Sequence, residues 1–151
     1  MYYQDIEDAR KEFLKAQNNF LRLNYTFYHA LTVQINHSME IPPAKFIALK
    51  SKTGQIDNII EECVYLEDNY CQMKIGYIFG HIMHKVLLKT QMRDANNLTL
   101  IVKTDFSEGS FDFFISGTDV KNLKFDEVIH FICSSLINGY GKMQDFYKVG
   151  K

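Results

Sequence analysis

The first 40 residues carry the pattern that most restricts how this chain can fold. Bulky apolar residues recur every seven positions, and mostly small ones recur three positions after each of them. The bulky row is Ile6, Phe13, Phe20 and Phe27, and the second row is Ala9, Ala16, Leu23 and Ala30. This is the a/d heptad pattern of a helix that packs along its whole length. It predicts a helix from about residue 3 to about residue 37, which Pro42-Pro43 would end.

The length of this helix is itself informative. At 1.5 Å per residue it would be roughly 50 Å long, whereas a globule of 151 residues is only about 30 to 40 Å across. The helix must therefore either break, near Asn24-Tyr25-Thr26, or extend beyond its own domain. An extension would expose the a/d row and favour a partner. The alternative is that a second apolar row widens the face that packs on the domain; that row is Leu14, Leu21, Tyr28 and Ile35.

From residue 44 the apolar period changes from 3.5 to 2, which is typical of strands with one buried face. The segment from Cys71 to Phe79 alternates almost without error, and Gly80-His81 follows as a two-residue turn with glycine first. That turn places Phe79 opposite Ile82 and Cys71 opposite Thr90. Nearly all of the resulting face is apolar, which supports this register.

A second hairpin is predicted between residues 100 and 115. A turn at Ser107–Ser110 would place Phe106 opposite Phe111 and Val102 opposite Ile115. The same register would set Asp105 opposite Asp112 on the outer side. Further strands are expected at residues 45–50 and 59–66, joined through residues 51–54, although Ile59–Glu62 could also be helical.

A period of 3.6 returns near the end of the chain. Phe125, Val128, Ile129, Ile132 and Leu136 form one stripe, which predicts a helix over about residues 123–138 that stops at Asn138-Gly139. The complete prediction is a single α+β domain over residues 1–151. A long N-terminal helix packs on a five- or six-stranded antiparallel meander sheet, whose strands cover about residues 44–117, and a C-terminal helix follows.

Charge and composition exclude several functional classes. The net charge is −1, and only 3 of the 17 basic residues are arginine, so we expect neither nucleic acid nor a membrane surface as a partner. No apolar run reaches the length of a transmembrane helix. The acidic, polar start does not resemble a signal peptide. The three cysteines, Cys63, Cys71 and Cys133, are typical of reduced buried thiols, so a cytoplasmic location is expected.

Motifs that carry chemistry are weak. His81 and His84 form an H-x-x-H pattern across a turn, where the side chains would diverge, so we predict no metal site and no cofactor. Cys133 and His130 have i, i+3 spacing, but the apolar surroundings of Cys133 favour a structural thiol. The acidic pairs lie in predicted turns or on a polar face. An enzymatic role is therefore not indicated, and no catalytic residue is assigned.

The outer face of the predicted sheet is the more useful signal. Five large apolar residues lie there among lysines and other polar residues: Ile78, Met83, Leu87, Ile101 and Phe114. Such a group indicates either a partner-binding surface, coverage by the C-terminal helix, or scattered single residues.

These patterns favour a small protein-binding module that forms a homodimer and binds or occludes a partner protein, in the manner of immunity proteins, inhibitors or chaperones. The candidate interface residues are Phe13, Phe20, Phe27, Ile78, Leu87, Ile101 and Phe114. One alternative is a ligand-binding or enzymatic domain with a pocket between helix and sheet, with Tyr77, His84 and Thr104 as its polar groups. Another is a single-stranded nucleic-acid binder on the sheet face, which would need Phe114 and Tyr65 exposed beside lysines.

Overall fold

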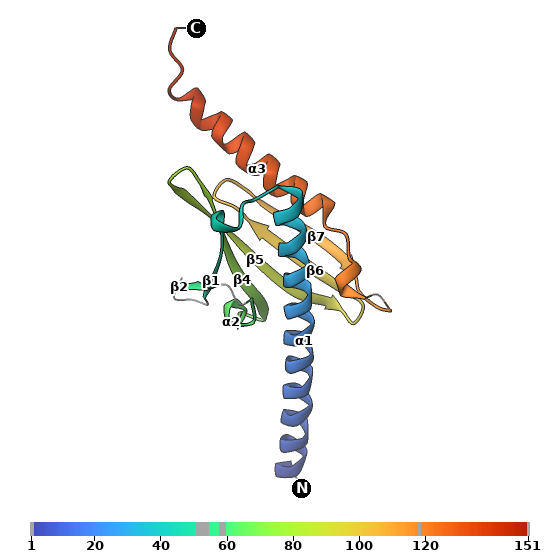
Figure 1. Ribbon diagram of the computed structural model, residues 1–151. Helices are drawn as coiled ribbons and strands as arrows, with labels where there is room; N and C mark the ends of the chain where they lie inside the picture. The colour runs from blue at the N-terminus through green and yellow to red at the C-terminus, as the bar shows by residue number, and fades with distance from the viewer. Residues whose placement is uncertain (1, 51–54, 58–59, 118, 151) are drawn as a thin grey trace.

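The described residues form a long helix, an antiparallel sheet and a second long helix, as predicted (Figure 1). The structure is a computed structural model and describes residues 2–50, 55–57, 60–117 and 119–150. The main elements are α1 (Tyr2–Ser38), β1 (Phe46–Lys50), β4 (Tyr70–Phe79), β5 (Ile82–Asp94), β6 (Asn97–Lys103), β7 (Glu108–Phe114) and α3 (Asp126–Asp145). The short elements are η1 (Pro43–Lys45), β2 (Gln55–Asp57), α2 (Ile60–Cys63), β3 (Tyr65–Glu67) and η2 (Val120–Asn122).

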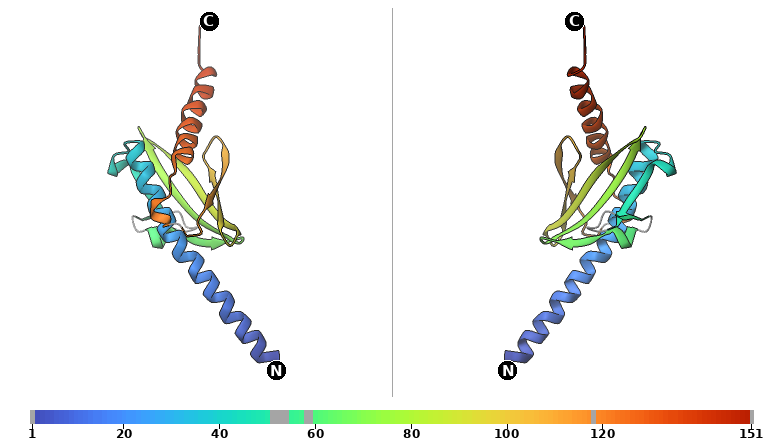
Figure 2. Two further views of the ribbon diagram at one scale, coloured as in Figure 1. Left: turned by 90° about the vertical axis from the view of Figure 1, so that its right-hand side faces the viewer. Right: turned by 90° about the vertical axis from the view of Figure 1, so that its left-hand side faces the viewer.

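Helix α1 runs without a break, so the predicted alternative of an interruption near Asn24 is wrong. The Asn24 side chain is buried, donates to the carbonyl oxygen of Phe20 at 2.9 Å and accepts from the hydroxyl of Thr90. Its polar groups are thus satisfied where the helix meets the sheet. The N-terminal half of α1 extends beyond the sheet in all three views (Figures 1 and 2). Pro42 and Pro43 follow the end of the helix, as expected.

The β4–β5 hairpin has the predicted register. Phe79 pairs with Ile82, and Cys71 pairs with Thr90. Gly80 has a φ of +63°, a conformation that glycine adopts at little cost at the first position of this turn.

The β6–β7 hairpin differs from its prediction. Val102 pairs with Gly109 instead of Ile115, because the chain turns at residues 104–107. The hydroxyl of Thr104 accepts from the backbone N–H groups of Phe106 and Ser107, both at 3.1 Å, and thereby fixes the earlier turn. The partner of each β6 residue shifts by six positions. Because six is even, the side chains that stay paired in β6 and β7 keep their predicted faces.

The opposite edge of the meander is also more complex than predicted. Strands β1 and β3 share one edge of β4: β1 pairs with its second half and β3 with its first residues. The strand predicted over residues 59–66 is wrong in its first part, since residues 60–63 are helical, which the sequence had left open. Asp68 and Asn69 both have positive φ and form the two-residue β3–β4 turn. The predicted connection at residues 51–54, and residue 59, lie outside the described part.

Both long helices pack on one face of the sheet. Phe27 of α1 contacts the rings of Phe113 in β7 and Phe125, which precedes α3, with centroids 5.5 and 5.3 Å apart. Phe131 of α3 packs edge-on against Phe111 of β7. One apolar cluster therefore joins α1, the inner face of the sheet and α3. The alternative that the C-terminal helix covers the outer face is consequently wrong.

Helix α3 also continues past its predicted stop at Asn138-Gly139 and ends at Asp145. Gly139 is buried, and a Cβ atom on it would lie 2.2 Å from the ring of Phe106. This glycine permits a close helix-to-turn contact and does not end the helix. Gly109 has the same role in β7, where the ring of Phe131 lies 2.9 Å from an added Cβ.

Candidate functional site

The N-terminal half of α1 presents an apolar row to solvent. Ile6 is 65% exposed and Phe13 is 61% exposed, although both belong to the a row of the heptad pattern. We call this row the exposed seam; its members, all exposed, are Tyr2, Ile6, Ala9, Phe13 and Ala16. Large apolar side chains that line up on one face of a helix are rarely left uncovered in a monomeric protein.

The same row is buried in the C-terminal half of α1. Phe20 and Leu23 are half-buried against the core, and Phe27 is fully buried. The proposed interface role of Phe27 is therefore wrong, because its ring lies between Tyr28, Phe113 and Phe125. Of the three phenylalanines predicted at an interface, Phe13 is exposed, Phe20 lies at the boundary, and Phe27 belongs to the core.

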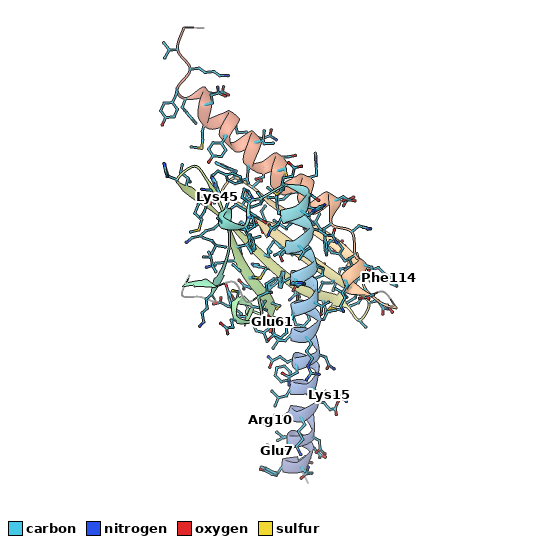
Figure 3. All side chains as sticks on the ribbon, in the orientation of Figure 1. Glu7, Arg10, Lys15, Lys45, Glu61 and Phe114 are labelled. Carbon is cyan, nitrogen blue, oxygen red and sulfur yellow. The ribbon has the colours of Figure 1, made fainter. Side chains whose placement is uncertain are left out.

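The polar flanks of the overhanging helix carry mixed charge. Arg10 lies 4.0 Å from Glu7, one turn away, and their side chains are 61% and 34% exposed. Figure 3 shows Glu7, Arg10 and Lys15 on the part of α1 that stands clear of the sheet. Such a pair contributes little to stability. The flanks of this segment therefore carry charges of both signs, while the seam itself is apolar.

The outer face of the sheet is uncovered by any helix among the described residues. Ile78, Leu87 and Ile101 are half-buried there, and Phe114 is 60% exposed at the end of the edge strand β7 (Figure 3). The registers confirm that these residues and Met83 share the face opposite the core. The outer face is therefore the second exposed apolar surface of the molecule.

The side chains of the three predicted pocket residues form hydrogen bonds within the protein. The hydroxyl of Tyr77 is buried and donates to the side-chain oxygen of Asn36 at 3.1 Å. The hydroxyl of Thr104 lies 2.5 Å from that of Ser135 in α3. Large buried side chains of α1 fill the space between helix and sheet: Phe27, Tyr28, Leu31 and Ile35.

The third of these residues, His84, belongs to a chain of hydrogen bonds that the sequence did not reveal. Its Nδ1 lies 2.7 Å from Asp105 Oδ2, and its Nε2 lies 2.5 Å from the hydroxyl of Tyr140 in α3. The shifted hairpin turn brings Asp105 here, so it does not face Asp112, which instead binds Arg93 at 3.0 Å. The chain links β5, the β6–β7 turn and α3, and both nitrogens of His84 are engaged within the protein.

Buried groups elsewhere are poor candidates for chemistry. Burial raises the pKa of the Cys71 thiol to about 12, and burial likewise raises the pKa of Cys133. Raised pKa values keep both groups as protonated thiols near neutral pH, which is the opposite of what a nucleophile needs. His81 lies exposed in its turn, away from the engaged ring of His84.

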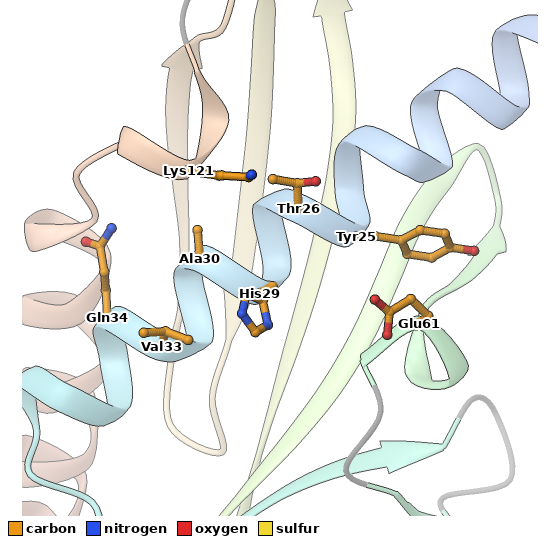
Figure 4. A pocket seen from close by; sticks show the side chains of 8 residues that line it. All are labelled: Tyr25, Thr26, His29, Ala30, Val33, Gln34, Glu61 and Lys121. Carbon is orange, nitrogen blue, oxygen red and sulfur yellow. The ribbon is translucent and has the colours of Figure 1, made fainter.

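A groove of about 580 Å³ runs along the outer flank of α1. Figure 4 shows Lys121 of η2 and Glu61 of α2 on opposite sides of the helix, with Thr26 of α1 between them. The charged groups come from different elements and do not converge on one point. The groove therefore lacks the arrangement of polar groups that fixes a ligand.

Comparisons with protein-family models, with curated proteins and with solved structures find no match. Within the described ranges, no helix is long and apolar enough to cross a membrane. The same ranges contain no group of three or more His, Cys, Asp or Glu side chains that could hold a metal ion. The geometry of the two exposed apolar surfaces therefore carries the functional argument.

Proposed function

We propose that this protein is a protein-binding module that forms a homodimer through the exposed seam of α1. The observation that carries the proposal is the change along one helix. A single heptad row is buried by the chain's own sheet from Phe27 onward, yet it lies open to solvent at Ile6 and Phe13. A second copy of the chain offers a surface that fits this row.

Side-chain size favours self-association. The a positions of the seam are bulky, at Ile6 and Phe13, whereas the d positions are small, at Ala9 and Ala16. In an antiparallel pair of helices, a positions of one chain pack beside d positions of the other. Each bulky side chain would then meet an alanine, which allows close packing of the two helices.

Steric constraints also favour the antiparallel orientation. The seam lies on the same stripe that contacts the sheet at Phe27 and Ala30. A parallel partner helix that followed this stripe would run into the sheet at its C-terminal half. In the antiparallel orientation, only the N-terminus of the partner's helix would come near the sheet of the first chain, beside Phe20. The partner's own sheet would lie beyond the N-terminus of the first chain's helix.

The area involved is adequate for a stable contact. Tyr2 and Phe13 of the seam are 81% and 61% exposed, and Tyr3 beside the seam is 75% exposed. Since aromatic side chains bury roughly 150–250 Å² each, these three residues alone leave roughly 300–500 Å² to cover in each chain. With Ile6 and the alanines, two copies come close to the roughly 1,200 Å² of the smaller specific interfaces.

The first test is solution mass by light scattering across a dilution series. The wild-type chain should have twice its 17.7 kDa monomer mass. Phe13→Asp places a charge in the seam and should yield the monomer. Asn18→Asp places the same charge on the exposed opposite side of the helix and should leave the dimer intact. A wild-type monomer at all concentrations, or equal effects of both changes, would contradict the proposal.

The orientation has its own test. Spin labels on Gln4→Cys, in a Cys133→Ser background, should lie about 20 Å or more apart in an antiparallel dimer, because the labelled ends lie at opposite ends of the overlap. In a parallel dimer the two labels would lie at the same level of the helix pair, so this offset along the helix axis would be absent and their separation would be shorter. A dimer with the short distance would refute the antiparallel arrangement and leave self-association standing.

Beyond self-association, the proposed module binds a partner protein on the surface that the dimer leaves open. The outer sheet face, with Ile78, Leu87, Ile101 and Phe114, supports this role. Occlusion of a partner, in the manner of an inhibitor or chaperone, needs only such a surface and no catalytic groups.

A further inference from the structure

Four lysines surround one apolar residue at the centre of the outer face. Leu87 in β5 pairs directly with Lys74 of β4 on one side and Lys103 of β6 on the other. Lys85 and Lys89 precede and follow Leu87 by two residues in β5, so they share its face. Directly opposed residues have Cβ atoms roughly 5 Å apart, and their diagonal neighbours are roughly 7–8 Å apart. The four ammonium groups therefore form a local positive patch on a chain whose net charge is −1.

The patch is not neutralised within the described part of the chain. None of the four lysines forms a salt bridge there. Glu108 stands opposite Lys103 in the register without an ion pair to it, and Lys89 lies 4.7 Å from the centre of the Tyr70 ring. Like charges gathered on one sheet face repel one another, which an anionic partner would relieve.

An apolar row crosses this patch obliquely. It begins at Ile101, which pairs with Lys89, continues through Leu87 and reaches Met83. Met83 extends the row across β4, because its sulfur lies 2.8 Å from where a Cβ of Gly76 would be. The absence of a side chain at Gly76 thus lets a methionine cover the adjacent strand.

The lysines flank this row in two pairs. Lys74 and Lys89 lie on one side of the line from Ile101 through Leu87 to the Met83 sulfur over Gly76, whereas Lys85 and Lys103 lie on the other. An apolar row with two cations on each side is complementary to an amphipathic helix whose apolar stripe has acidic residues on both sides. Such a helix would place its stripe along Leu87 and its carboxylates against both lysine pairs.

We propose that the outer sheet face is a docking site for an acidic amphipathic helix of a partner protein. The inference rests on the partner-binding role proposed above, but this surface is separate from the seam of α1, so it does not depend on the homodimer. Lysines and no arginine form the patch, and Phe114 is the sole strongly exposed aromatic among the described residues of the face. Nucleic-acid binders of this type rely on arginine and on several stacking rings, so the composition favours carboxylates.

The test uses synthetic probes and the full chain. The probe is a labelled peptide of about 20 residues, long enough to form a helix, with leucine at heptad positions a and d and glutamate at e and g. Fluorescence anisotropy should detect binding that weakens as salt rises from about 0.01 to 0.15 M. A peptide with lysine at e and g, and one with serine in place of leucine, should not bind. Failure of the glutamate–leucine peptide to bind would overturn the proposal.

Protein variants locate the site. The double variant Lys85→Glu with Lys103→Glu reverses the charge of the lysine pair on one side of the apolar row. Because both positions are exposed, circular dichroism should show an unchanged fold. Binding should weaken at least about tenfold. The control, Lys124→Glu with Lys148→Glu, makes the same change in net charge at exposed positions outside the sheet and should bind like the wild type. Equal weakening in both double variants would mean a nonspecific charge effect and would overturn the site.

Other occupants give different outcomes. Tighter binding of oligothymidylate, or of phosphatidylserine-containing vesicles, than of the peptide would contradict an acidic protein partner. Light scattering separates this proposal from the homodimer: Lys85→Glu with Lys103→Glu should leave the solution mass unchanged. If that variant lost the dimer, the patch would serve self-association and the docking proposal would be wrong.

Discussion

The two halves of α1 share one sequence pattern and have opposite environments. Around Phe27 the heptad row is fully buried, and aromatic rings from the sheet and from the start of α3 surround it. Around Phe13 the same row lies in solvent. A heptad pattern therefore specifies that a helix face will be covered, but it does not specify by what. In this protein the chain itself covers one half, and we propose that a second copy covers the other.

The largest expected effect is a difference between the two halves of α1 in how much an alanine substitution lowers the free energy of unfolding. Phe27→Ala should lower the free energy of unfolding by about 3–5 kcal/mol, since it opens a cavity in a closed core. Phe13→Ala, measured at low protein concentration, should change it by less than about 0.5 kcal/mol. Urea denaturation of both variants gives the comparison. Similar losses at the two positions would mean that the overhanging half packs on the domain.

Two glycines of α3, one packed against a ring and one open to solvent, allow a similar comparison with smaller expected effects. Gly139→Ala should cost about 1–3 kcal/mol, because the new Cβ meets the ring of Phe106. Gly141→Ala, two residues later, meets nothing within 4 Å and should raise helix stability by about 0.5–1 kcal/mol. Thermal unfolding should therefore shift in opposite directions. A neutral Gly139→Ala would show that the helix can move away from the turn.

The smallest effect concerns the hydrogen bond that holds α3 to the sheet. Tyr140→Phe removes the hydroxyl near His84 Nε2 and should cost about 1 kcal/mol. Tyr147→Phe serves as its control, because that side chain is 81% exposed and should change nothing measurable. If chemical denaturation finds no difference between these variants, the chain from Asp105 to Tyr140 contributes nothing to stability.

Sequence reasoning succeeded where a repeating pattern dominated. The β4–β5 register follows from strict alternation and a glycine-first turn, and the outer-face positions of Ile78, Met83 and Leu87 follow from that register. Sequence reasoning was wrong where a single local contact determines the position of a turn or the end of a helix. The Thr104 hydroxyl accepts from two backbone N–H groups and so places the second turn earlier than predicted. Gly139 lies inside a helix that it was predicted to end, because its missing Cβ leaves room for the ring of Phe106. The Asp105–His84–Tyr140 chain depends on both of these features, so no periodic signal could have revealed it. The Asp68-Asn69 turn, in contrast, agrees with its residue types, because both residues have positive φ, a conformation that Asp and Asn tolerate.

The measurement that tests the central claim most directly is amide hydrogen exchange as a function of protein concentration. Peptides from residues 24–36 should show strong protection at every concentration, since the sheet covers that half of α1. Peptides from residues 5–20 should gain protection as concentration rises, because a second copy covers the seam. Weak protection of residues 5–20 at every concentration would contradict the account, since the exposed half of the helix would then have no second copy to cover it.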